Sequence, residues 1–203
     1  MNLKSIFILN KILRYFFIFI TITFTFTQTG VFTDKRDGQS YEWVKIGSQI
    51  WMAENLKYKS WGSGYYDLNL YGRLYNWKKA KKACPKGWHL PSDDEWTTLE
   101  RNTGGENAGK NLKSKTGWKF YIQAGNGIDL YGFGGLPGGY YQFHNKRYMY
   151  YGSGITFWTS TASNYPDVGE SAITRELNSH RDGIDSGEMY VVHGVYCRCV
   201  KDP

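Results

Sequence analysis

The sequence lacks the long aliphatic runs at helical spacing from which helical bundles are built. It is rich instead in glycine, with 24 residues, and 18% of its 203 residues are aromatic. This composition favours short strands and loops over a bundle of helices. The length fits one domain that can bury a substantial core.

Clusters of basic residues are also scarce. The formal net charge is +7, but Lys4, Lys11 and Arg14 lie in an N-terminal segment that we expect to be removed, which leaves +4 on the mature chain. We interpret the one dense basic run, residues 78–82, as the solvated face of a helix. Nucleic-acid-binding domains carry a basic patch or stripe, so nucleic acid is not an expected partner.

Signatures of catalysis and of metal binding are missing as well. The chain has no G-x-S-x-G motif for a hydrolase nucleophile. It lacks the E-P-N, Q-P-D and W-N-D triplets of calcium-dependent lectins, and residues 182–188 do not have the spacing of a calcium loop. The glycine-rich run 132–139 lacks the flanking strand and helix of a phosphate-binding loop. We therefore expect no catalytic residue, no cofactor and no metal.

The first 30 residues are typical of an export signal. A basic start precedes an apolar run from Tyr15 to Phe26, which is too short to span a bilayer comfortably. No A-x-A cleavage pattern follows, so an uncleaved anchor is the alternative. No cysteine follows the run either, which excludes a lipid anchor of the lipobox type. We expect a domain over residues 31–203 that is secreted or held in the cell envelope, without membrane contact beyond the signal.

Only three cysteines are present, Cys84, Cys197 and Cys199. In an oxidising compartment they are expected to pair. A bridge from Cys84 to either C-terminal cysteine would close a long loop, and the chain-entropy model gives it on the order of 4–5 kcal/mol of stability. A strand over residues 195–200 would place Cys197 and Cys199 on one face. The residues alone leave open which of the two pairs, and whether the remaining thiol is packed or reactive.

Turn signals and periodicity predict two helices between residues 71 and 102. The first should stop at Cys84, because Pro85 disfavours helix at the residue before it. The second begins with a capping box formed by Ser92 and Glu95. The other predicted elements are a hairpin of strands 40–46 and 49–53, a short helix within 107–115, and strands over 156–161, 171–177, 189–192 and 195–200.

The segment from residue 120 to 154 is rich in glycine and in aromatic residues and has no clear period. Adjacent tyrosines in an extended segment cannot both face inward. Tyrosine offers a large amphipathic face on which sugar rings stack. The alternative is that these rings fill the core, as we expect for Trp43, Trp51, Trp77, Trp88, Trp96 and Trp118. The candidate ligand-binding residues are Tyr140, Tyr141, Phe143, Tyr148, Tyr150 and Tyr151.

Seven motifs occur in a fixed order over nearly all of the chain that follows the signal. They are Asp37–Tyr41, Gln49–Leu56, Tyr71–Trp77, Cys84–Ser92, Leu136–Gly139, Phe157–Ser160 and Arg198–Asp202. Together they resemble the Fibrobacter major paralogous domain, an exported bacterial family.

The resemblance implies an α+β fold of the C-type-lectin-like kind, with two helices packed on small antiparallel sheets and long loops rich in glycine and aromatic residues. It also implies a disulfide between Cys84 and Cys199, from the first helix to the last strand. Cys197 stands where an apolar residue is usual. More distantly, the corner Leu90–Trp96 is similar to the L-P-T-x-x-E-W corner of the formylglycine-generating sulfatase-modifying factors.

These observations favour an exported binding or adhesion module without catalysis, whose ligand is a carbohydrate or another cell-surface polymer. Two alternatives remain. One is an enzyme like the formylglycine-generating factors, whose chemistry uses a reactive cysteine pair. The other is a structural surface protein that associates with itself.

Overall fold

The computed structural model describes residues 28–59, 65–68, 70–119, 125–163 and 169–203. The export signal expected over residues 1–30 therefore lies almost wholly outside the described residues. Thr29 and Gly30, at its end, already belong to strand β1 (Thr29–Thr33). None of the helices in the described ranges is long and apolar enough to cross a membrane.

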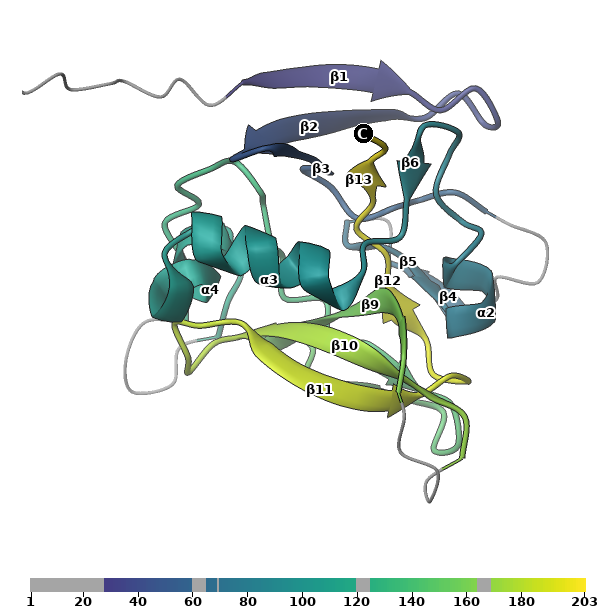
Figure 1. Cartoon of the computed structure of the whole chain (residues 1–203). Helices are drawn as coiled ribbons and strands as arrows, with labels where there is room; N and C mark the ends of the chain where they lie inside the picture. The colour runs from purple at the N-terminus through teal and green to yellow at the C-terminus, as the bar shows by residue number, and fades with distance from the viewer. Residues whose placement is uncertain (1–27, 60–64, 69, 120–124, 164–168) are drawn as a thin grey trace, which may run out of the picture.

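The strands of the described chain form three sheets (Figure 1). The first sheet has five strands, in the order β1, β2 (Ser40–Ile46), β3 (Gln49–Met52), β13 (Val200–Lys201) and β6 (Trp88–His89). The second has six, in the order β11 (Asp185–Tyr190), β10 (Ser171–Asn178), β9 (Gly154–Ala162), β12 (Val195–Tyr196), β5 (Gly72–Tyr75) and β4 (Tyr65–Leu68). The pair β12–β9 is parallel, so this sheet is mixed.

The third sheet is a two-stranded hairpin, β7 (Tyr140–Gln142) with β8 (Arg147–Met149). Three short α-helices complete the described elements, α2 (Trp77–Ala80), α3 (Asp93–Asn102) and α4 (Ala108–Leu112), with a 3-10 turn at Gly105–Asn107. The predicted α+β class is confirmed at this level.

Helix α3 lies between the two large sheets (Figure 1). Its Trp96 ring contacts Trp51 of β3 at a centroid distance of 5.0 Å and Phe157 of β9 at 5.1 Å. On the side of the six-stranded sheet, Arg175 of β10 donates to Asp93 at the start of the helix, at 2.7 Å. A second ion pair joins Arg175 to Glu100 of the same helix at 3.2 Å, so the helix joins both sheets through one buried aromatic cluster and two ion pairs.

The predicted start of this helix is confirmed. The Ser92 hydroxyl accepts from the Glu95 N–H at 3.2 Å, and the Glu95 carboxylate accepts from the Ser92 N–H at 2.7 Å. The hairpin β2–β3 is also found as predicted, with Gly47 in the left-handed conformation (φ +61°) at its turn.

The first predicted helix is wrong in its extent. Only Trp77–Ala80 is helical, and Asn76 caps it by accepting from the Lys79 N–H at 3.0 Å. Residues 72–75 form β5 instead, because they pair with β12 on one side and β4 on the other. These long-range pairings outweigh the helical spacing that the local sequence shows. The first helix is accordingly much shorter than expected.

The last predicted strand is interrupted, although its alternation holds. β12 belongs to the six-stranded sheet and β13 to the five-stranded sheet, so residues 197–199 cross from one to the other. Cys197 and Cys199 are buried on one side of this crossing. On the other side, Arg198 donates to Asn55 Oδ1 at 2.9 Å and 2.7 Å.

A disulfide joins Cys84 to Cys199, with a Cα–Cα distance of 5.9 Å. This confirms the pairing that the family resemblance implied, which the residues alone left open. Cys84 follows α2 rather than lying within a helix. Cys197 is free and buried.

Candidate functional site

The β7–β8 hairpin separates the candidate ligand-binding tyrosines into two groups. Tyr141 is only 5% exposed and belongs to the hydrophobic core. Tyr148 packs against that core, with its ring 5.4 Å from the ring of Tyr141. The argument that adjacent tyrosines face opposite ways is confirmed for Tyr140 and Tyr141. Tyr141 offers little surface to a ligand, because β7 turns its ring inward.

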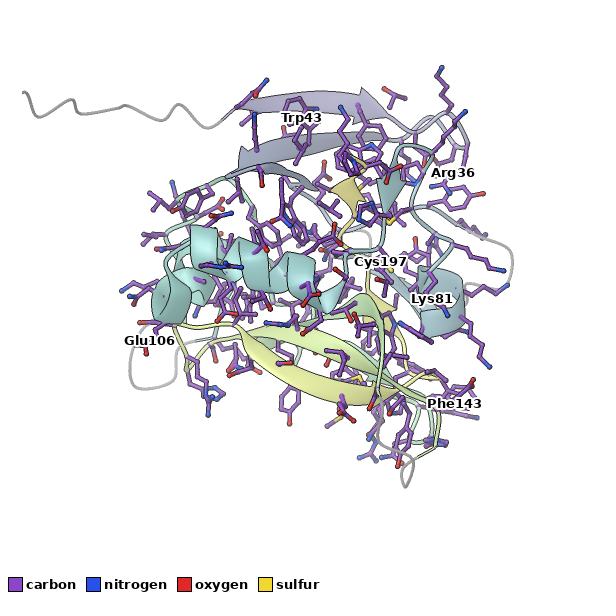
Figure 2. The ribbon with its side chains drawn as sticks, in the orientation of Figure 1. Arg36, Trp43, Lys81, Glu106, Phe143 and Cys197 are labelled. Atoms are coloured by element: carbon purple, nitrogen blue, oxygen red, sulfur yellow. A yellow bond between two sulfur atoms is a disulfide. The ribbon has the colours of Figure 1, made fainter. Side chains whose placement is uncertain are left out.

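The remaining candidates lie at or near the surface. Tyr140 is half-buried, and Tyr150 is 60% exposed, with its ring 6.0 Å from that of Tyr140. Tyr151 is exposed but packs edge-on against Tyr71, at 5.4 Å. Phe143 is exposed at the margin of the molecule, whereas Cys197 lies in its interior (Figure 2).

The hairpin meets the end of β11 in a cluster of aromatic rings. The ring of His193 lies 6.2 Å from Tyr140 and 5.9 Å from Tyr190. His144 lies 5.9 Å from His193 and 6.5 Å from Tyr190. These contacts bring residues from two separate stretches of the chain together.

A cavity of about 310 Å³ opens within this cluster. We call it the tyrosine cup, and its lining residues are Tyr140, Ser171, Glu188, Met189, Tyr190 and His193. Ser171 is 8% exposed, and its Oγ has no hydrogen-bond partner among the described residues. Glu188 Oε2 accepts from the Ser163 hydroxyl at 2.7 Å.

The hydrogen bonding of His193 fixes its tautomer. Its Nδ1 accepts from the Phe143 N–H at 3.2 Å, so the neutral ring carries its proton on Nε2. Burial lowers the pKa of His193, and the nearby His144 lowers it further. The ring is therefore neutral at neutral pH and supplies an N–H donor beside the tyrosines.

The cysteines do not form a free dithiol in this structure. Cys199 is held in the disulfide, and burial raises the pKa of the Cys197 thiol well above its usual value. A high pKa opposes formation of the reactive thiolate. Within the described ranges, no group of three or more His, Cys, Asp and Glu side chains could hold a metal ion.

Sequence reasoning missed most of the lining of the tyrosine cup. Ser171, Glu188, Tyr190 and His193 were not among the candidates. The register of the sheet brings them together, since Ser171 lies opposite Tyr190 in the β10–β11 pair. The predicted strand 171–177 supplied one half of this pair, but strand β11 begins at Asp185, earlier than the predicted 189–192.

Comparison with known proteins gives one match. No curated protein and no solved structure matches the chain. The sequence profile of the Fibrobacter succinogenes major domain matches residues 44–201, a range that holds both disulfide cysteines and the whole tyrosine cup but not strand β1. The chain therefore belongs to the Fibrobacter succinogenes major domain family.

Proposed function

We propose that this protein is an exported binding module that holds carbohydrate in the tyrosine cup, without calcium and without catalysis. The observation that carries the proposal is the cup itself, in which aromatic rings surround a cavity with a buried hydroxyl that has no partner among the described residues.

The chemistry of the cup suits a sugar. Tyr140 and Tyr190 supply apolar faces with polar edges, on which the C–H face of a sugar ring can stack. A buried hydroxyl without a partner costs about 1–3 kcal/mol, so a ligand hydroxyl that pairs with Ser171 would recover this energy. The N–H of His193 and the Glu188 carboxylate add a donor and an acceptor. Ligand sites commonly combine aromatic walls with a few polar groups in this way.

The disulfide supports the proposed location. Stable disulfides are typical of proteins in oxidising compartments outside the cytosol. The Cys84–Cys199 bridge is therefore consistent with an extracellular domain, secreted or held at the cell envelope. We further propose that the arrangement is C-type-lectin-like, since a helix packs between two sheets and the disulfide fixes the C-terminal strand.

One observation favours self-association as a second candidate function. Strand β1 is the end strand of its sheet, and Val31 on it is 64% exposed. Edge strands with exposed apolar side chains can pair with another chain. Analytical ultracentrifugation would reveal self-association as an apparent mass that rises with protein concentration. Val31→Lys should abolish this rise.

The proposal is tested by screening the mature chain against a glycan array and insoluble polysaccharides, with and without EDTA. We expect saturable binding that survives EDTA and weakens at least tenfold in Tyr190→Ala and Ser171→Ala. Tyr151→Ala is the matched control, because Tyr151 is an exposed tyrosine that does not line the cup. Absence of binding to any sugar, or equal binding by all variants, would overturn the proposal.

A further inference from the structure

A second cavity, of about 400 Å³, opens farther along β10. We call it the polar cavity. Asp185 accepts there from Arg181 at 2.8 Å and from Asn178 at 2.5 Å, and Thr156 bonds to Glu176 at 3.0 Å. Its walls include Tyr150, Thr156, Glu176, Asn178, Arg181 and Asp185.

Tyr140 and Tyr150 connect this cavity with the tyrosine cup. Tyr140 lines the cup, Tyr150 lines the polar cavity, and their ring centroids are 6.0 Å apart. Burial raises the pKa of Tyr140, and Tyr150 and Glu176 raise it further. The two cavities are therefore neighbours on one surface.

The backbone of Tyr150 is itself unusual. Its φ is +56°, a conformation that costs a bulky side chain roughly 1–3 kcal/mol and that clusters at binding sites. Its carbonyl accepts from the Ser153 and Gly154 N–H groups at 2.9 Å and 2.8 Å, so Tyr150 begins a tight turn. The turn presents the exposed ring at the border of the polar cavity.

Strand β10 carries three buried side-chain oxygen atoms without partners in the described part of the chain. Among the described residues, Ser171 Oγ, Thr174 Oγ1 and Asn178 Oδ1 have no hydrogen-bond partner. Ser171 lines the cup and Asn178 lines the polar cavity. From Ser171 to Glu176 the strand advances by five residues, roughly 17 Å of extended chain, which is longer than a single sugar ring.

We propose that the tyrosine cup and the polar cavity are two subsites of one groove that binds an extended oligosaccharide chain. This inference rests on the proposed function and adds the class of ligand, a chain of several sugar units rather than a terminal monosaccharide. One unit stacks in the cup, the Tyr140–Tyr150 pair supports the units between, and the carboxylates and amide of the polar cavity bond the hydroxyls of a further unit.

The test is a calorimetric titration of the mature chain with cello-, xylo- and chito-oligosaccharides of one to six units. We expect an affinity that rises at least tenfold between one unit and four units in the series that binds, and then levels off. Tyr150→Asn removes the ring while keeping a residue that tolerates positive φ. This variant and Arg181→Ala should reduce the length-dependent gain to less than twofold, with the affinity for short sugars unchanged.

The controls separate this inference from the proposed function. Tyr151→Asn removes the adjacent exposed tyrosine, which lines neither cavity, and should retain the full gain with length. The groove would be overturned, but the cup left in place, by tight binding that does not depend on the length of the oligosaccharide. Tight binding of long oligosaccharides by Tyr150→Asn would have the same meaning. Failure of every oligosaccharide to bind would overturn both.

Discussion

At the scale of single residues, burial separates tyrosines that the sequence presents as equivalent. Tyr141→Ala should lower the free energy of unfolding by about 3 kcal/mol or more, because it empties a core position. Phe143→Ala, two residues farther on and exposed, should change it by less than about 0.5 kcal/mol. Urea denaturation of both variants measures the difference. Equal effects would contradict the placement of Tyr141 on the core-facing side of β7.

His89 makes stability depend on pH. Its Nδ1 lies 2.7 Å from Asp202 and its Nε2 2.8 Å from Glu95. Partial burial opposes protonation, but the bonds to Asp202 and Glu95 outweigh it and raise the pKa of His89.

A raised pKa in the folded state means that the charged form stabilises the fold. The contribution is fully present below the unfolded pKa of about 6.5 and is lost as pH rises through the folded value. His89→Gln should therefore lose the most stability, relative to wild type, at pH 5. The loss should be less than about 1 kcal/mol, because the pair is partly exposed. Thermal denaturation of His89→Gln and wild type at pH 5 and pH 9 checks this. A stability difference between the two that grows with pH would contradict it.

At the scale of elements, local sequence signals predicted helix α3, because the residues that specify its start lie close together in the sequence. Helix α3 begins at its capping box because both partner bonds lie within four residues of each other. Strand β5 was not predictable in this way, because its partners β4 and β12 are supplied by other parts of the chain. The β7–β8 hairpin was missed for a related reason, since glycines and aromatic residues mask the alternation in a three-residue strand.

The capping box gives a prediction at this scale. Ser92→Ala should cost about 1 kcal/mol of stability, because the Glu95 N–H loses its partner. Thr98→Ala, in the same helix, is the control and should be neutral or slightly stabilising, since alanine has the higher helix propensity. Equal losses in the two variants, measured by chemical denaturation, would show that the cap is not responsible.

At the scale of the whole molecule, the disulfide ties the region after α2 to the last crossing between the sheets. It closes a loop of 115 residues. Cys84→Ser combined with Cys199→Ser should therefore lower the free energy of unfolding by about 3–5 kcal/mol. Reductant should destabilise the wild type and Cys197→Ala alike, because both retain the bridge. A melting temperature unaffected by reductant would contradict this role.

The family, the α+β class and the disulfide were predictable because they follow from ordered motifs and from cysteine chemistry. The tyrosine cup was predictable only in part. Tyr140 was identified from its own segment, but Ser171 and Tyr190 become neighbours only through the register of β10 and β11. His193 joins them because the Phe143 N–H binds its ring from the hairpin. A site assembled from three distant stretches leaves no local pattern in the sequence.

The central claim is that the surface over β10, from the tyrosine cup to the polar cavity, binds carbohydrate. The most direct measurement is a comparison of ¹H–¹⁵N spectra of the mature chain with and without cello-, xylo- or chitohexaose. We predict shifts concentrated in β7, β8, β10 and β11, and in the backbone of Tyr150 and His193. Shifts centred on β1 or α2, or no shift with any of the three sugars, would contradict the account.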